Sequence, residues 1–407
     1  MVKTFAKVAL SAAVASLSVT AFGQALEEVV VTAQKRTESL QDVPISVTAI
    51  SGELIQDASI RSFGELGAYV PNFSVSENAV NTIITMRGIS IGGNQSFEQS
   101  VGIFLDGVYL GRSRQARLGL FDLEQVEVLR GPQGILFGKN TLGGAINVRS
   151  AAPVVGEGLS GRVAASFESD NGEYFEGHIS GSVSENVAMR LAVMDRSIDG
   201  YLDNVDLAAA YPNSPTTDET IARIGLQWEP SESTSVGLRY TYSDYRRVGQ
   251  TAVVTDFGPT LVDSTGDGIR NQPFVPSSNA LMYGIMGLRY PTYAPTTSSR
   301  DVFYDGLSIG GTGSLDGGNG PERLSGTDTE NHEFSLNIEH EFGNGMTLTS
   351  VTGASQYEYK DGIEADFLPV EFIGRSDDSE FDQFSQEIRL ASDLDGRFSW
   401  VVGGNFL

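Results

Sequence analysis

The sequence contains no cysteine and only three histidines among its 407 residues. Without cysteine the chain can form neither a disulfide framework nor a thiolate metal site. The histidines, His178, His332 and His340, are too few and too scattered to favour a Ser/His/Asp hydrolase or a histidine metal cluster. We therefore expect no catalytic residues, no bound metal and no cofactor.

Basic residues are also scarce. The chain has 27 Lys and Arg against 52 Asp and Glu, for a net charge of −25. Nucleic-acid binding requires a basic face, so this composition argues against a nucleic-acid partner. An excess of negative charge suits a solubilising surface or the lining of a lumen.

Beyond the N-terminus, no stretch approaches the roughly 20 apolar residues of a membrane-spanning helix. The first residues form a different kind of segment, with a basic start at Lys3 and Lys7 and an apolar run from Val8 to Val19. Gly23-Gln24-Ala25 then has the small-x-small pattern of a cleavage site. We predict that residues 1–25 are a signal peptide and that the protein is exported.

The glycine-rich stretch from Asp122 to Pro153 marks a change of pattern along the chain. It contains two expected strands, Gln125–Leu129 and Ala145–Val148, joined by a compact loop. Its Gly138-Lys139 pair superficially suggests a phosphate-binding loop. A Walker A loop would need glycine and Ser or Thr where the chain has Gln133 and Asn140, so we reject that interpretation.

Before this stretch the sequence predicts a small α+β domain. A strand over 43–50 precedes two short helices, the second of which opens with a capping-box pattern at Ser62 and Glu65. Further strands are expected at 83–86 and 101–105, and Asp106-Gly107 is a strong tight-turn signal.

The segment EEVVVTAQKR, from Glu27 to Arg36, precedes this domain. Three consecutive valines and a threonine favour an extended backbone. An exposed strand of this kind can pair with the sheet edge of a partner protein. It can equally be the first strand of the following domain.

After the stretch, strands of about 10 residues alternate between apolar and polar side chains, the length that a tilted membrane-spanning strand needs. A soluble β-sandwich would show the same alternation. The connections separate the two alternatives, because tight turns at 184–186, 230–233 and 343–345 mostly alternate with long loops. The long loops are expected at 198–219, 246–328 and 358–382. This arrangement is typical of an outer-membrane barrel, and Trp228, Tyr240, Tyr242 and Tyr245 suit its aromatic girdles.

About nine strands are expected, and the last one reaches the final residues Phe406 and Leu407. Bacterial single-chain barrels have an even number of strands and no free edge. We therefore expect the chain to be a fragment of a longer protein.

Several motifs together resemble the N-terminal half of a TonB-dependent outer-membrane receptor. Besides the valine-rich segment they are VPNF at 70–73, MRG at 86–88, FLDGVYLGR at 104–112, VEVLRGPQGILFGKNTLGGAINV at 126–148 and FSQEIRLAS at 384–392. Lys139 stands where related plugs often carry Arg.

The resemblance implies a TonB box and tail at 26–36, a plug domain at 37–153 and a partial β-barrel at 154–407, of a kind that has 22 strands in the family. The implied function is active import of a scarce solute, a ferric siderophore first, across the outer membrane of a Gram-negative bacterium. The partners would be TonB with its inner-membrane energising complex, and outer-membrane lipid. The box residues would be Glu28, Val29, Val30, Val31, Thr32 and Ala33.

The resemblance also implies ligand contacts at the outward tips of the plug. Because the plug must be retained in the barrel, we add the hypothesis of a charge lock between plug and barrel, against the alternative that these charges are simply solvated in the lumen. Candidate ligand residues are Gly93, Asn94, Gln95, Tyr109, Arg112 and Arg114. Candidate anchors are Arg87 and Arg130 in the plug, with Glu333 and Glu387 facing the lumen.

Alternatives remain open at this point. The solute could be cobalamin or a glycan, and the chain could be a binding-only receptor or a non-functional fragment. A passive porin would lack a plug and a box, and a barrel enzyme would need a placed histidine and nucleophile. Asp263–Gly268 resembles the start of a calcium loop, but position twelve is Phe274, so we interpret it as a turn.

Overall fold

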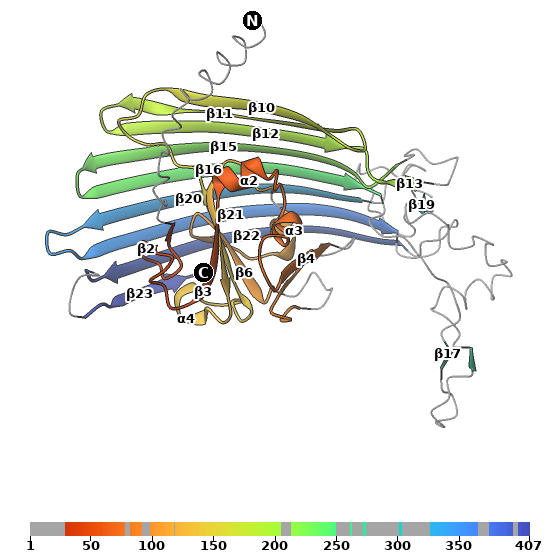
Figure 1. Ribbon diagram of the computed structural model, residues 1–407, viewed down its shortest axis with the longest axis horizontal. Coiled ribbons are helices and arrows are strands. Elements are labelled where there is room, and N and C mark those ends of the chain that lie inside the picture. The colour runs from red at the N-terminus through yellow and green to blue at the C-terminus, as the bar shows by residue number, and fades with distance from the viewer. Residues whose placement is uncertain are drawn as a thin grey trace, which may run out of the picture.

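A computed structural model describes residues 29–77, 82–91, 98–117, 119–204, 213–249, 261–262, 272–273, 301–302, 326–364, 374–393 and 398–407. It has two parts, a large curved sheet of long strands and a small domain that packs against one face of this sheet (Figure 1). In the part of the chain that the structure describes, no helix is both long and apolar enough to cross a membrane.

The large sheet has nine strands, and each pairs antiparallel with the next one along the chain. They are β10 (Ser160–Glu168), β11 (Gly172–Ser184), β12 (Val187–Ile198), β15 (Thr216–Ser231), β16 (Thr234–Val248), β20 (Gly326–Glu341), β21 (Thr347–Glu364), β22 (Gly374–Ala391) and β23 (Val401–Phe406). This meander confirms the predicted fold class, a plug domain followed by antiparallel barrel strands.

The polarity of the two faces of the sheet is the reverse of that in a soluble protein. Apolar side chains on the outer face are exposed, including Phe167 at 86%, Val163 at 72% and Phe384 at 53%. Polar side chains on the inner face are buried beneath the small domain, for example Thr241 at 2% and Ser243 at 3%. A sandwich would bury its apolar face, so the sheet is the wall of a barrel.

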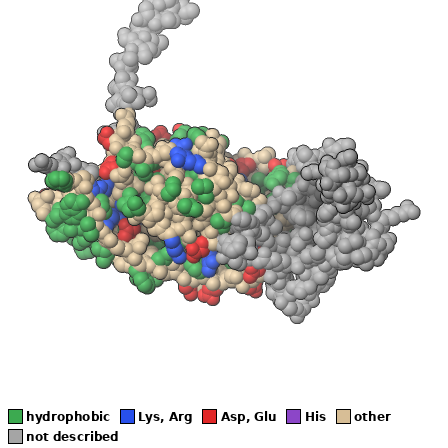
Figure 2. Space-filling view, turned by 90° about the horizontal axis from the view of Figure 1, so that it is seen from below, with side chains coloured by type: hydrophobic (Ala, Val, Ile, Leu, Met, Phe, Trp, Pro, Cys, Tyr) green, Lys and Arg blue, Asp and Glu red, His purple; other side chains and the backbone are tan. Residues whose placement is uncertain are grey.

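Figure 2 shows hydrophobic side chains gathered at the left end of one face of the molecule, the end at which Figure 1 places β23.

Tyr245, which the sequence grouped with the aromatic girdle, alternates in step with the buried Thr241 and Ser243 and so faces the lumen.

The strands are longer than the sequence predicted. Residues 358–382 were expected to form a long loop, but β21 continues to Glu364 and β22 already begins at Gly374. Charged residues caused this error, because they form cross-strand pairs such as Lys360 with Asp378. Five short strands lie among the outer connections: β13 (Leu202–Asn204), β14 (Asn213–Ser214), β17 (Leu261–Val262), β18 (Gln272–Pro273) and β19 (Asp301–Val302). The Asp263–Gly268 turn lies outside the described residues.

The small domain is built on a five-stranded sheet with the order β3-β8-β9-β6-β7. These strands are β3 (Ser46–Ser51), β6 (Val101–Leu105), β7 (Val108–Leu110), β8 (Leu123–Arg130) and β9 (Gly144–Ser150). The other elements are β1 (Val30–Val31), β2 (Glu38–Ser39), α2 (Gly52–Asp57), α3 (Phe63–Leu66), β4 (Phe73–Glu77), β5 (Thr82–Met86), the 3-10 helix η1 (Ser113–Arg117) and α4 (Gly134–Phe137). Its apolar core includes Leu66, Ile84, Val126 and Ile146, all fully buried.

The local signals in this domain are confirmed. Ser62 caps α3, since its Oγ accepts a hydrogen bond from the backbone N–H of Glu65 at 3.3 Å. The Asp106-Gly107 turn joins β6 to β7, with Asp106 at φ +49° and Gly107 at φ +87°.

Candidate functional site: the interface between plug and wall

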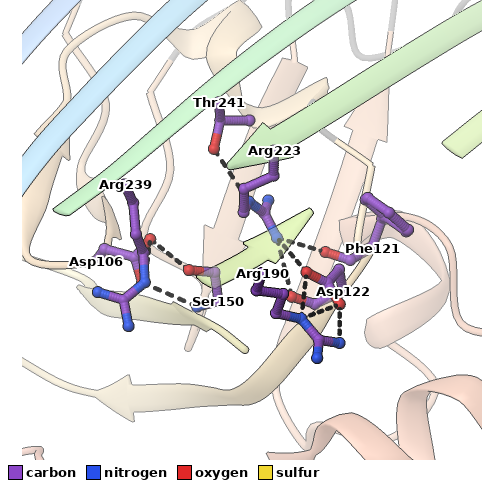
Figure 3. Close-up of polar contacts among 8 residues, drawn as sticks. All are labelled: Asp106, Phe121, Asp122, Ser150, Arg190, Arg223, Arg239 and Thr241. Atoms are coloured by element: carbon purple, nitrogen blue, oxygen red, sulfur yellow. Dashed lines mark hydrogen bonds and ion pairs between the residues drawn. The ribbon is translucent and has the colours of Figure 1, made fainter. Parts of the chain in front are cut away.

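Two carboxylates of the small domain bind arginines of the wall (Figure 3). The Nε–H of Arg190, from β12, donates to both carboxylate oxygens of Asp122 at 3.0 and 3.1 Å. Arg223, from β15, donates through Nη1 to the backbone carbonyls of Phe121 and Asp122, each at 2.9 Å. The side chains of Asp122 and Arg223 are only 2% and 3% exposed, so this contact is screened little by solvent.

The second carboxylate, Asp106, belongs to the tight turn between β6 and β7. It accepts hydrogen bonds from the backbone N–H and the hydroxyl of Ser150 at 2.9 and 2.7 Å. Arg239 of β16 places its Nε 3.9 Å from Asp106, an ion-pair distance, and Asn337 of β20 donates to the Asp106 carbonyl at 3.3 Å. The turn is therefore held to the wall as well as to its own sheet.

Strand register explains how the wall presents its arginines. Arg190 lies opposite Gly225, and Gly225 lies opposite Arg239. The two arginines thus flank a position without a side chain, where an added Cβ would lie 3.4 Å from Pro153. We call Asp106, Asp122, Arg190, Arg223 and Arg239 the arginine clasp.

The η1 segment makes a second set of contacts with the wall. Arg114 forms a buried ion pair with Asp361 of β21, donates to Thr327 at 3.1 Å and stacks over Tyr359 at 4.4 Å. Burial alone would lower the pKa of the Arg114 guanidinium, but the Asp361 carboxylate outweighs it and the pKa is raised.

Gln115, the next residue of η1, donates to Glu333 of β20 at 2.9 Å and to Ser355 of β21 at 3.1 Å. Nearby, Glu77 of β4 accepts from Arg247 of β16 at 2.6 Å. Burial opposes ionisation of Glu77, yet Arg247 and Arg117 outweigh it and hold its pKa below the ordinary value. Both contacts join the outward end of the plug to the wall.

The candidate TonB box is folded back onto the small domain. Val30–Val31 pairs with Glu38–Ser39, and Val31 and Ala33 are fully buried. The backbone N–H of Thr32 donates to Glu127 at 2.7 Å. Asn147 donates to the Thr32 hydroxyl and to Glu127, each at 3.1 Å. Glu127 is itself fully buried, so the box completes a polar network inside the domain.

Residues just after the box bind the wall. Lys35 forms an ion pair with Glu387 of β22 at 3.1 Å and lies over the Phe137 ring at 4.6 Å. Burial lowers the pKa of Lys35, and Glu387 offsets part of this shift. Arg36 donates to Ser399 at 2.6 Å, beyond the end of β22. Glu28 lies outside the described residues.

The anchors singled out from the sequence have other partners than expected. Arg130 donates to the Pro71 carbonyl at 3.4 Å, within the plug, and Arg87 occupies a turn at φ +51° next to Gly88. Glu333 and Glu387 do contact the plug side, but through Gln115 and Lys35. The sequence led us to expect arginines on the plug and carboxylates on the wall. In the arginine clasp the plug supplies the carboxylates and the wall supplies the arginines. A role of Arg87 and Arg130 in retention stays a prediction.

The residues of the arginine clasp were not among the site residues predicted from the sequence, although the sequence contains a partial signal for two of them. Arg239 alternates opposite to the apolar face of its strand, which places it in the lumen. Asp106 was interpreted as a turn residue, which it is, but its side chain also binds Ser150 and Arg239.

Among the candidate ligand residues, Gly93, Asn94 and Gln95 lie outside the described residues. Tyr109 is 7% exposed, its hydroxyl accepts from Asn140 at 2.7 Å, and burial raises its pKa to about 12. Arg112 stacks over Phe381 at 4.3 Å, and Arg114 is buried against Asp361. Ligand binding by these residues stays a prediction.

The comparisons with known proteins agree with this architecture. Residues 39–145 match the family model of the TonB-dependent receptor plug domain. The chain carries the plug and barrel strands of a TonB-dependent receptor. The pesticin receptor of Yersinia pestis is 26% identical over 206 residues, which are 50% of this chain and 30% of that receptor. The ferrioxamine B receptor of Salmonella typhimurium is 27% identical over 207 residues, 48% of this chain and 27% of that receptor.

Solved receptors share the fold. The ferric yersiniabactin uptake receptor of Yersinia pestis superposes with a TM-score of 0.65 at 19% identity, covering 88% of this chain and 47% of that one. The ferripyoverdine receptor of the outer membrane of Pseudomonas aeruginosa gives 0.62 at 18%, covering 93% and 44%. The chain therefore spans less than half the length of these receptors. The domain boundaries drawn from the sequence stay predictions.

Proposed function

We propose that this chain supplies the plug and part of the wall of a receptor that imports a ferric siderophore across the outer membrane of a Gram-negative bacterium. TonB, driven by the inner-membrane energising complex, would pull on the box and so move the plug. Curated relatives named for ferrioxamine B and ferrichrome support this solute class. In this function the solute is bound and transported, and no covalent bond is made or broken.

The observation that carries the proposal is the docked box. Within Val29–Ala33, the two-residue strand Val30–Val31 pairs with Glu38–Ser39, and hydrogen bonds from Thr32 to Glu127 and from Asn147 to Thr32 hold the segment on the plug. Val29 and Val30 remain 47% and 38% exposed. A short extended segment can leave these contacts and add to the edge of a partner's sheet, where main-chain hydrogen bonds resist tension.

The box is tested by replacing Val30 with proline. Proline has no backbone N–H and therefore removes one donor from any strand pair with TonB. We expect Val30→Pro to abolish energised uptake while the affinity for the ferric chelate stays unchanged. Val30→Ala, which keeps the backbone donor, is the matched control. Undiminished uptake of radiolabelled ferric chelate by Val30→Pro cells would refute the role of the box.

The solute class is tested by growth of a deletion strain on a panel of ferric siderophores, cobalamin and glycans. Growth that requires the gene on a ferric siderophore supports the proposal. A vitamin B12 transporter of Vibrio vulnificus is 26% identical over 239 residues, so cobalamin is the second candidate. Dependence on cobalamin or a glycan alone would replace the solute and leave the mechanism in place.

A further inference from the structure

Glu333, on the inner face of β20, is a buried carboxylate without a cationic partner. It is 8% exposed. One carboxylate oxygen, Oε1, accepts hydrogen bonds from Gln115 of η1 and from Ser355 of β21, each at 2.9 Å. The other oxygen, Oε2, is buried without a hydrogen-bond partner. In the part of the chain that the structure describes, no lysine or arginine forms an ion pair with Glu333.

A lone buried carboxylate needs a compensating positive charge. Burying an unpaired ion is costly, so buried carboxylates in proteins are paired, bind a metal ion or take up a proton. Gln115 and Ser355 are neutral donors, and they orient the carboxylate without compensating its charge. A ligand with one positive charge would complete this site.

The neighbours of Glu333 also carry unpartnered oxygen atoms. Asn331 and Ser335 lie two residues before and after it, on the same face of β20. Tyr357 of β21 is opposite Asn331 in the strand register and therefore diagonal to Glu333. Oδ1 of Asn331, Oγ of Ser335 and the hydroxyl oxygen of Tyr357 are all buried without a partner. We call these three residues and Glu333 the oxygen cluster.

The number of these oxygens distinguishes a metal ion from a proton. A proton on Oε2 of Glu333 can be shared with one neighbouring acceptor, which leaves the other oxygens unpartnered. A metal ion binds several oxygen atoms at once, and carboxylate and amide oxygens are ligands of hard cations. The Asn331 amide suits this role, because its Nδ2 donates to Ser243 of β16 at 3.1 Å and its Oδ1 has no other partner.

The charge of the site favours a monovalent ion. Ca²⁺ sites usually contain several carboxylates, whereas the described residues include no group of three or more His, Cys, Asp and Glu that could hold a metal ion. The arginines beside the oxygen cluster have carboxylates of their own. Arg239, opposite Ser335 in the register, lies 3.9 Å from Asp106. Arg114, next to Gln115 in η1, pairs with Asp361.

We propose that the oxygen cluster binds a monovalent alkali cation such as Na⁺ beneath η1 of the plug. Gln115 contacts the Glu333 carboxylate, so the bound ion stabilises the plug in its position against the wall. The sequence predicted no bound metal because cysteine and histidine are scarce, and that argument does not extend to a site made of oxygen atoms. The proposal goes beyond the proposed function and depends neither on the solute nor on TonB.

The linkage between ion binding and plug release tests the site. Purified receptor is studied in NaCl at several concentrations, with choline chloride added to keep the ionic strength constant. Urea-induced release of the plug is followed by tryptic cleavage. If one ion binds only the seated plug, the equilibrium constant for release falls about tenfold for each tenfold rise in Na⁺ above its Kd. The same dependence in KCl also supports the site, and no dependence in either salt would overturn it.

Glu333→Gln removes the charge and keeps the shape of the side chain. We expect release of the plug in this variant to be independent of Na⁺. Glu387→Gln is the matched control, because Glu387 is a wall carboxylate already paired with Lys35 and Arg389. Its Na⁺ dependence should equal that of the unaltered receptor. Na⁺ dependence that persists in Glu333→Gln would place the ion elsewhere, and release that responds to pH but not to Na⁺ would assign a proton to Glu333; either result contradicts the proposal.

Tyr357→Phe provides a test that does not require Glu333→Gln to fold. Removing a buried hydroxyl that has no partner should be neutral or stabilising, whereas removing a ligand of a bound ion should weaken ion binding. In choline chloride we therefore expect this variant to be at least as stable as the unaltered receptor. It should need at least about tenfold more Na⁺ for the same stabilisation. An unchanged Na⁺ requirement would show that the oxygen cluster does not coordinate the ion.

Discussion

At the residue scale, Asp122 shows how a turn residue becomes an anchor. Its φ of +52° is left-handed, a conformation that Asp and Asn tolerate better than most residues. This backbone geometry exposes both the carboxylate and two carbonyls to the wall, where Arg190 and Arg223 bind them. A buried charge pair of this kind is costly to break, because removing one partner leaves the other charge buried and uncompensated.

Asp122→Asn tests this anchor with little change of shape or backbone preference. It removes the charge that compensates Arg190 and Arg223, so we expect the plug to lose about 3 kcal/mol of stability. Urea-induced release of the plug, followed by tryptic cleavage, measures the change. Glu124→Gln is the control, because its pair with Arg149 is 45% and 31% exposed and should contribute under about 1 kcal/mol. Equal effects of the two variants would contradict the anchor.

Glu77 gives the interface a pH dependence. Its pKa is lowered in the folded protein, so its contribution is fully present above the ordinary value of 4.5 and is lost as the pH falls through the lower, folded pKa. Hydrogen exchange of β4, relative to the intrinsic rate at each pH, should therefore accelerate only below the ordinary carboxyl pKa of 4.5. Glu77→Gln should exchange faster at neutral pH and lose this acid transition; an unchanged transition would exclude Glu77 as its source.

At the element scale, α2 packs against β8 through a glycine. A Cβ on Gly52 would lie 1.8 Å from the backbone carbonyl oxygen of Leu123, and backbone cannot move aside cheaply. In α3, a Cβ on Gly64 would meet nothing closer than the Ser62 hydroxyl at 3.6 Å. The small domain thus contains one helical glycine with no room for a Cβ, Gly52, and one with free space around it, Gly64.

Gly52→Ala should destabilise the plug by about 3 kcal/mol, because the helix must shift away from β8. Gly64→Ala should be neutral or stabilise it by about 0.5 kcal/mol through the lower entropy of the unfolded chain. Thermal denaturation of both variants, read by circular dichroism, gives the comparison. Similar midpoints would mean that α2 is not fixed on β8 as described.

Elements were predictable here where the determining signal is local. Alternation gave the barrel strands, Asp106-Gly107 gave a turn and Ser62 a helix cap. The clasp was not predictable, because its partners are far apart in sequence, 68 residues for Asp122 and Arg190. Alternation tells which face Arg239 occupies, but not that Asp106 lies opposite. Partner choice depends on how the plug sits in the barrel, which no local pattern encodes.

At the scale of the whole molecule, rows of paired residues across the wall locate the membrane. The row through Leu191 is apolar: Leu191, Ile224, Tyr240, Phe334, Ala354 and Phe384. Four residues further along β12, the row through Asp195 continues with Thr220 and then four carboxylates: Asp244, Glu330, Glu358 and Glu380. Tyr242 and His332 lie between the two rows, paired with each other. Aromatic residues favour the lipid–water interface, so the hydrocarbon boundary lies between Leu191 and Asp195.

This boundary is tested by placing an arginine on either side of it. Leu191→Arg introduces a charge into the apolar row and should destabilise the inserted barrel by about 2–4 kcal/mol, with reduced assembly into the outer membrane. Asp195→Arg introduces the same side chain about 13 Å away along the strand, into the polar row, and should assemble normally. Heat-modifiable mobility of the receptor in isolated outer membranes reports assembly of each variant. If both arginines are tolerated equally, the row through Leu191 does not face lipid, and the outer face of this sheet needs another covering.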